Sequence, residues 1–192
     1  GYGDPRDKEI KNLFACRAVR RAFAGMTCVG ALKKDAAGNI VEVGVPRGAI
    51  AALSPSVSPV STTVATALLA IKSGNAIVFC LHPRAAHAMA KVLDLIVDAA
   101  NGAGLPEGSV SYLPVPAKQG VAELIGHPSI RLVLNSGVDR MMDICRKSSK
   151  PLIYGGTGNG PAFIERSADV CTAARLIVLS KSFDHGTAPS AE

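Results

Sequence analysis

The sequence contains no tryptophan, and phenylalanine and tyrosine together make up only 4% of its 192 residues. A surface that stacks nucleic-acid bases needs exposed aromatic side chains, so this scarcity argues against one. The net charge of +6 comes from dispersed basic residues, whose densest groups are RAVRR and RKSSK. We therefore expect an ordinary solvated surface that attracts anionic ligands, with nucleic-acid binding as the weaker alternative.

Membrane and metal signals are also missing. No apolar run reaches the roughly 18 residues of a membrane span, and the opening GYGDPRDKEIKN is too polar for a signal peptide. Neither His82 nor His87 has a metal-ligand partner at a recognised spacing, so we expect no metal site. The cysteines lack CxxC spacing and indicate reduced thiols in the cytoplasm. They are Cys16, Cys28, Cys80, Cys145 and Cys171.

What the sequence does contain is enough apolar residues for a globular domain: 48% are hydrophobic and the mean hydropathy is +0.26. Residues 4–24 predict an amphipathic helix, with Asp4 as its cap and Pro5 at its first position. Its apolar residues recur at helical spacing. They are Ile10, Leu13, Phe14, Ala18 and Phe23.

The rest of the chain alternates between short apolar runs and helical patterns. After a turn at 35–39, we predict strands at 40–55 (two short strands or one bent strand), 75–81, 109–115, 130–136, 151–156 and 161–165. Helices are predicted at 61–74, capped by Ser61 or Thr62, and at 84–104, 117–127, 139–149 and 167–183. This order is typical of an α/β fold, a parallel sheet with helices on both faces. Such sheets bind ligands at the carboxyl ends of their strands.

Two predicted strand ends carry candidate anion-binding residues. In SPSVSPVST (54–62), prolines bracket Ser56 and Ser58 before a helix whose free amides could hold an oxyanion or phosphate. A plain capping loop is the alternative. In CLHPRAAH (80–87), His82, Pro83 and Arg84 follow a buried strand, and a cation there suits a ribose or phosphate. The alternative is a helix start with a surface arginine.

Two further strand ends are rich in glycine. In LNSGVDRM, the Ser136–Gly137 turn would let a pyrophosphate approach the backbone amides, although Asp139 beside it would repel an anion. In YGGTGNGP, Gly155 and Gly156 open a loop with little side-chain bulk, which either turns sharply or admits a substrate. Asn159 is its one amide side chain, which both donates and accepts hydrogen bonds.

Three stretches resemble the CoA-acylating branch of the aldehyde dehydrogenase superfamily: NAIVFCLHPRA, KSSKPLIYGGTGNGPAFIERSADV and SKSFDHG. The resemblance is to the aldehyde-dehydrogenase half of bifunctional aldehyde–alcohol dehydrogenases and to their microcompartment relatives, and it spans 1–192. It implies a Rossmann-like cofactor domain, a catalytic domain and an oligomerisation flap. Because the family extends beyond both ends of this sequence, we expect 1–192 to be a single NAD- and CoA-binding domain, with the N-terminal segment and catalytic domain absent.

The resemblance also implies a reaction. In the family, a cysteine attacks an aldehyde, hydride passes to NAD, and CoA takes the acyl group from the resulting thioester. The implied cofactors are NAD and coenzyme A. The implied partners are a small aldehyde, further copies of the full-length protein and a bacterial microcompartment shell.

Family positions can be carried over onto individual residues. Ser136 and Gly137 fall where the family grips the cofactor pyrophosphate, and His82–Arg84 fall near the adenosine ribose. Gly155 stands where hydrolytic relatives place a glutamate base. An enzyme that passes its acyl group to CoA has no use for a base that activates water.

Two positions depart from the family pattern. Ser58 replaces the asparagine that helps to hold the oxyanion, and Pro189 occupies the position of the nucleophilic cysteine. Ser190 has no visible base to activate it, and we interpret Cys171 as a buried structural residue. The isolated chain is therefore expected to be inactive. The alternative is a catalytically inactive homologue that binds dinucleotide or CoA as a scaffold or regulator.

Overall fold

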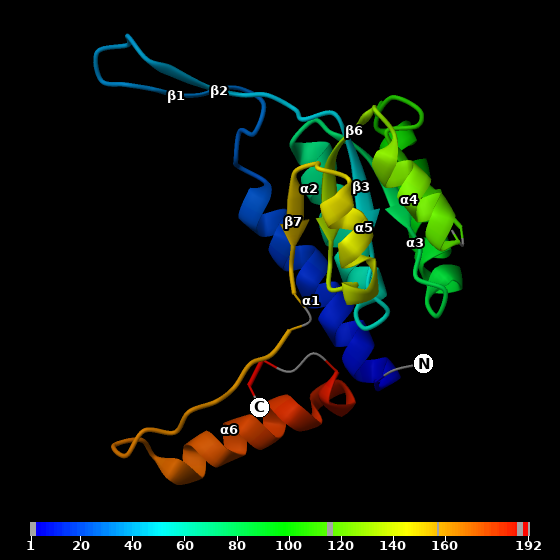
Figure 1. Ribbon diagram of the computed structural model, residues 1–192. Helices are drawn as coiled ribbons and strands as arrows, with labels where there is room; N and C mark the ends of the chain where they lie inside the picture. The colour runs from blue at the N-terminus through cyan, green and yellow to red at the C-terminus, as the bar shows by residue number, and fades with distance from the viewer. Residues whose placement is uncertain (1–2, 115–116, 157, 188–189, 192) are drawn as a thin grey trace.

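A five-stranded parallel sheet forms the centre of the protein in the computed structural model, which describes residues 3–114, 117–156, 158–187 and 190–191 (Figure 1). The strand order is β5-β4-β3-β6-β7, and every neighbouring pair is parallel. The strands are β3 (Ala49–Leu53), β4 (Ala76–Cys80), β5 (Val110–Leu113), β6 (Ile130–Asn135) and β7 (Leu152–Tyr154). The predicted α/β fold is confirmed.

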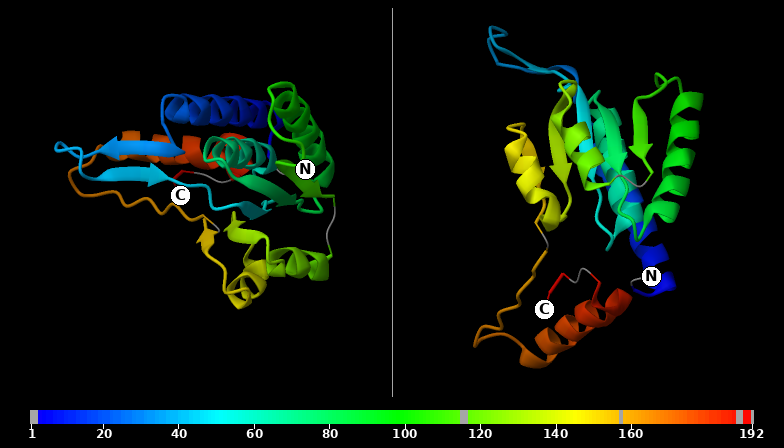
Figure 2. Two further views of the ribbon diagram at one scale, coloured as in Figure 1. Left: turned by 90° about the horizontal axis from the view of Figure 1, so that it is seen from above. Right: turned by 45° about the vertical axis from the view of Figure 1, so that its right-hand side comes forward.

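Helices cover both faces of this sheet, as Figure 2 shows from above. Helices α2 (Pro59–Lys72) and α3 (Ala86–Gly102) pack on one face, and α4 (Lys118–Gly126) and α5 (Met142–Lys147) pack on the other. Successive residues of a strand point to opposite faces. Ile50 of β3 therefore packs with α2 and α3, while its neighbour Ala51 joins the core beneath α4 and α5.

Helix α1 (Pro5–Phe23) begins as predicted. The Asp4 carboxylate accepts hydrogen bonds from the backbone N–H groups of Arg6 and Asp7, at 2.9 and 3.1 Å, and Pro5 takes the first helical position. The helix packs against α2, but none of its side chains is buried. Phe14 is 73% exposed, so the predicted apolar face lies open in this chain.

The segment before the sheet forms an exposed antiparallel hairpin of β1 (Gly30–Lys34) and β2 (Val41–Gly44), around the predicted turn at 35–39. Strand β1 was missed by the sequence analysis, because its residues GALKK lack the apolar alternation that predicts a strand. The hairpin projects from the sheet at the end opposite to α6 (Figure 1).

Two predicted helix starts need correction. Helix α2 begins at Pro59, so its N-cap is Ser58 rather than Ser61 or Thr62. Proline suits the first helical turn because its missing N–H would have no partner there. The helix predicted from residue 139 begins with a 3-10 turn, η1 (Asp139–Met141), and only then continues as α5.

The segment after β7 differs more from the prediction. Residues 161–165 form no strand, because this stretch is exposed and pairs with no neighbouring strand. Helix α6 (Val170–Ser182) has no buried residue, and Cys171 is exposed, so the interpretation of Cys171 as a buried structural thiol is wrong. The 3-10 turn η2 (Phe183–Gly186) follows α6. Within the described ranges, every helix is too short or too polar to cross a membrane.

Candidate cofactor-binding site

The carboxyl ends of β4, β3 and β6 lie side by side at one edge of the sheet. From β3 the chain proceeds to β4 and β5 on one side, and then returns to place β6 on the other side of β3. Open α/β sheets bind their ligands at such a reversal of strand order. A pocket of about 370 Å³ opens there. Its lining residues are Pro55, Ser56, Val57, His82, Arg84, Gly137, Val138, Asp139 and Arg140.

Asn135 holds the turn that follows β6. Its buried side chain accepts a hydrogen bond from the Val138 N–H at 2.7 Å and donates one to the Val138 carbonyl at 3.1 Å. The Ser136 N–H donates to the carbonyl of Leu53 at 3.1 Å, which ties the turn to β3. Gly137 has φ +83°, a conformation that favours glycine. The backbone of Gly137 is thus fixed at the pocket before any ligand binds.

Sequence analysis missed Asn135. The available signal was an asparagine at a strand end just before a Ser-Gly turn, where its side chain commonly bonds to the backbone ahead. Because Asn135 is also the last residue of a predicted buried strand, the sequence pattern alone did not distinguish a strand residue from one that holds the turn.

His82 lies between two arginines at this pocket. Its Nδ1 lies 3.2 Å from the Arg84 backbone N–H, and its Nε2 lies 3.1 Å from Nη2 of Arg140. Burial, together with the charges of Arg140 and Arg84, lowers the pKa of His82, so the ring is neutral near pH 7. A neutral imidazole accepts at only one nitrogen, so the two contacts belong to alternative tautomers. Arg140 was also missed by the sequence analysis.

A second pocket of about 660 Å³ adjoins the start of α2. Ser56 and Arg84 line it as well as the first pocket, and Ser58 lines it as the N-cap of α2. The Ser58 hydroxyl makes no capping hydrogen bond to the helix. Lys8 and Lys11 of α1 also line this pocket, and both are paired with the carboxylate of Asp184. The N-terminus of α2 favours an anion here.

The structure brings Ser56, His82, Arg84 and Gly137 together at the first pocket, and Ser136 lies in the adjoining turn. Pro83 follows His82 and lines a small cavity of about 60 Å³ beside it. None of the described pockets includes Gly155, Gly156 or Asn159 in its lining.

The glycine-rich loop after β7 begins by extending the sheet. The Gly155 N–H donates to the Asn135 carbonyl at 3.0 Å, which extends the pairing of β6 and β7. Close approach occurs instead at Gly160, where an added Cβ would lie 2.8 Å from the Ser190 carbonyl oxygen. Asn159 is exposed, and Pro189 lies outside the described residues.

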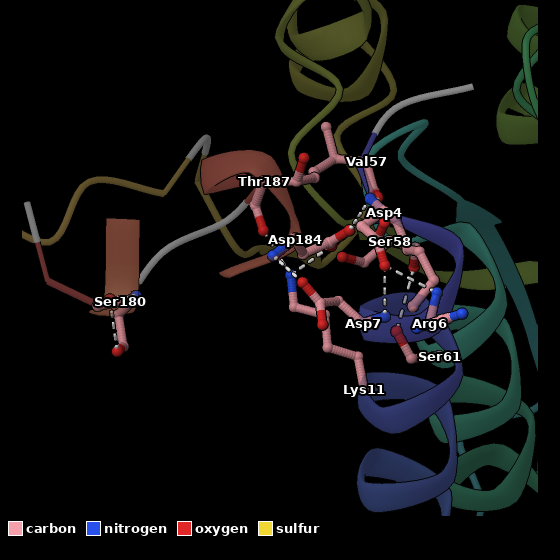
Figure 3. Close-up of polar contacts among 12 residues, drawn as sticks. Asp4, Arg6, Asp7, Lys11, Val57, Ser58, Ser61, Ser180, Asp184 and Thr187 are labelled. Atoms are coloured by element: carbon pink, nitrogen blue, oxygen red, sulfur yellow. Dashed lines mark hydrogen bonds and ion pairs between the residues drawn. The ribbon is translucent and has the colours of Figure 1, made fainter. Parts of the chain in front are cut away.

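A buried carboxylate fixes the turn after α6, as Figure 3 shows. Asp184 accepts hydrogen bonds from Nζ of Lys11 at 2.7 Å and from the Asp4 N–H at 2.9 Å, and Nζ of Lys8 lies 2.8 Å away. The Asp184 N–H donates to Asp7 at 2.7 Å. Burial would raise the pKa of the Asp184 carboxyl, but the hydrogen bonds from both lysines and the Asp4 N–H outweigh it and lower that pKa.

This network also reaches the loop after β3. Nζ of Lys8 donates to the carbonyl of Val57 at 2.8 Å, so one lysine bridges the Ser56–Ser58 loop and the η2 turn. The network joins α1, the loop before α2 and the C-terminal turn. Among the described residues, no group of three His, Cys, Asp or Glu side chains is placed to hold a metal ion.

Comparison with known proteins assigns the family. Residues 11–191 match the sequence model of the aldehyde dehydrogenase family. The chain belongs to this family. An aldehyde-alcohol dehydrogenase of Streptococcus pneumoniae serotype 4 is 34% identical over 192 residues, which are 100% of this chain and 22% of that protein. The acetylating acetaldehyde dehydrogenase EutE of Salmonella typhimurium is 32% identical over 188 residues, or 96% of this chain and 39% of that protein.

Solved structures of the family share the fold. A probable aldehyde dehydrogenase from Listeria monocytogenes EGD-e superposes with a TM-score of 0.92 at 42% identity, over 97% of this chain and 41% of that one. An acetylating aldehyde dehydrogenase from Geobacillus thermoglucosidasius superposes with a TM-score of 0.93 at 36% identity, over 100% of this chain and 42% of that one. This chain is thus homologous to CoA-acylating aldehyde dehydrogenases and spans less than half the length of each of these relatives.

Two more distant structures contain bound ligands. An engineered glycolyl-CoA reductase was solved with NADP+, at a TM-score of 0.68 and 29% identity, over 72% of this chain and 32% of that one. A propionaldehyde dehydrogenase from Rhodopseudomonas palustris was solved with propionyl-CoA. Its TM-score is 0.70 at 29% identity, over 74% of this chain and 31% of that one.

Proposed function

We propose that this chain is the cofactor-binding portion of an NAD-dependent, CoA-acylating aldehyde dehydrogenase that acts on a small aldehyde. One observation carries the proposal: Ser56, His82, Arg84 and Gly137 converge on one pocket where the strand order reverses. Homology to acylating enzymes supports the reaction class, and relatives bound to NADP+ and to propionyl-CoA support the two cofactors.

The residues at this pocket fit a dinucleotide. The Gly137 turn presents backbone without a side chain, and Arg84 supplies a cation for phosphate. When bound, NAD would supply a hydride acceptor and CoA an acyl acceptor. The chain's own part is to bind and orient these groups, with Ser58 offering a hydroxyl at the start of α2.

The test measures binding and turnover by the isolated chain separately. We expect weak binding of NAD or CoA and no conversion of aldehyde, because Pro189 offers no nucleophilic atom. Robust NADH production by this chain alone, in the presence of aldehyde and CoA, would contradict the proposal.

A non-catalytic homologue that binds dinucleotide or CoA as a scaffold or regulator remains the second candidate, favoured by Ser58 and Pro189 at two positions where the family carries catalytic groups. A full-length protein that binds cofactor but converts no aldehyde would favour it. The oligomer, the microcompartment shell, the cytoplasmic location and the absence of metal stay predictions.

A further inference from the structure

Two arginines from different elements line the pocket at the switch in strand order. Arg84 follows β4, and Arg140 lies in η1 after β6. The imidazole of His82 lies between them, 3.1 Å from Nη2 of Arg140 and 3.2 Å from the backbone nitrogen of Arg84. The neutral ring adds no charge of its own, so the two guanidinium groups set the positive charge at this end of the pocket.

Among the described residues, two arginines but only one carboxylate line this pocket. Asp139 is the one acidic residue in the lining of this pocket, and its Oδ1 accepts a hydrogen bond from the Tyr154 hydroxyl. Along the chain after β4, the first carboxylate is Asp94, which accepts from the Tyr112 hydroxyl at 2.9 Å. A dinucleotide site that selects an unphosphorylated ribose typically offers a carboxylate to the 2′-hydroxyl, whereas an arginine accommodates a 2′-phosphate.

We propose that Arg140, together with Arg84, binds a phosphomonoester on the ribose of an adenosine nucleotide. Guanidinium groups suit this ligand because their planar donors can bond two phosphate oxygens at once. Coenzyme A, a cofactor of the proposed reaction, carries such a group on the 3′-oxygen, and NADP+, which an engineered relative binds, carries one on the 2′-oxygen. The inference rests on the proposed function and refines it, since Arg140 then sets the specificity for a phosphorylated nucleotide.

The test compares two matched pairs of ligands by isothermal titration calorimetry: NADP+ with NAD+, and CoA with 3′-dephospho-CoA. We expect the unsubstituted chain to prefer the phosphorylated member of at least one pair by about tenfold, as expected for a charge-assisted hydrogen bond. Arg140→Gln should reduce that preference to about twofold, because Arg84 remains, while changing the affinity for the unphosphorylated member less than about twofold. Arg140→Lys should restore part of it. Which pair responds identifies the source of the phosphate.

Arg146→Gln provides the matched control, because Arg146 is exposed on α5 and lies outside the pocket lining. It should leave all four affinities unchanged.

Equal binding within both pairs, or an equal loss across all four ligands in Arg140→Gln, would overturn the inference while leaving the proposed cofactor site intact. Failure of the unsubstituted chain to bind any of the four ligands would overturn the proposed function and this inference with it. Arg140 is itself exposed, so the variant should fold, and an unchanged melting temperature checks this.

Discussion

The sheet and the segment that follows β7 are held in place by different forces. In the sheet, β3 and β4 place alternate side chains into two apolar cores, which include Ile77 and Phe79 on one face and Val133 on the other. After β7, Asp184 is the only buried residue in the described part of the chain. The sheet is thus stabilised by apolar burial, whereas the C-terminal segment is attached by polar contacts that Asp184 and Thr187 make with the start of α1.

This contrast matters for function because the two regions carry different halves of the proposed chemistry. The pocket with His82, Arg84 and Gly137 stands on the sheet, whose two faces each carry a buried apolar core. Pro189, which the resemblance places at the position of the family's nucleophile, follows η2 in the sequence and lies outside the described residues. Mutations at the pocket and at Asp184 should therefore have separable effects on cofactor binding and on the stability of η2.

The largest expected effect comes from the sheet core. Phe79→Ala removes a fully buried ring and should lower the free energy of unfolding by about 3–5 kcal/mol. Phe163→Ala is the matched control, because that ring is 91% exposed and its loss should change stability by less than about 0.5 kcal/mol. Urea denaturation followed by circular dichroism measures both. Equal effects would mean that the C-terminal segment packs as firmly as the sheet.

The next effect concerns Asp184. Asp184→Ala removes the acceptor of two lysines and of the Asp4 N–H, and should cost about 2 kcal/mol of local stability. Hydrogen exchange should show faster exchange in α6 and η2, while the amides of β3 and β4 keep their protection. Asp184→Asn keeps the shape without the charge and should give a smaller change. Loss of protection throughout the sheet would show that the two regions unfold together.

A smaller effect is expected at the pocket turn. Asn135→Ala removes both side-chain hydrogen bonds to Val138, so the N–H and carbonyl of Val138 lose their partner. The change should lower the free energy of unfolding by about 1–2 kcal/mol and weaken cofactor binding. Asn101→Ala serves as the control, because Asn101 is exposed near the end of α3. Chemical denaturation and a binding titration check the two expectations. An unchanged affinity in Asn135→Ala would show that the turn does not depend on this side chain.

The smallest effect is a dependence on pH. Since the pKa of Asp184 is lowered in the folded chain, the contribution of its carboxylate to stability is fully present above the pKa of the unfolded chain, about 3.9. It is lost as the pH falls through the lower folded value. Exchange protection of η2 should therefore decline under acid conditions before the sheet unfolds, and Asp184→Asn should lose this response. An equal acid response in that variant would assign the effect to another group.

Most of the sheet could be predicted from its sequence. Runs such as NAIVFCL and IRLVLNS are bounded by turns and buried on both faces, so apolar pattern and structure agree. The same reasoning failed for residues 161–165 and for Cys171, because an apolar stretch forms a buried strand or core position only where another element packs on it. Composition says nothing of whether such a neighbour exists.

The candidate site was only partly predictable. Residues adjacent to a strand end, such as His82 and Gly137, are visible as motifs, whereas Arg140 and Lys8 reach the pockets only through tertiary packing. Asp184 lies 173 residues from Lys11 in sequence, and no local pattern indicates that pairing. Long-range polar contacts of this kind need the fold before they can be inferred.

The central claim is that the carboxyl edge of β4, β3 and β6 binds the cofactor. Titration of the isotopically labelled chain with CoA and with NADP+, followed by amide chemical shifts in NMR spectra, tests it most directly. We predict that the largest changes in amide shift fall on His82, Arg84 and residues 136–140, with α6 unaffected. Changes centred on α6 or on residues 155–160, or no change at millimolar ligand, would contradict the account.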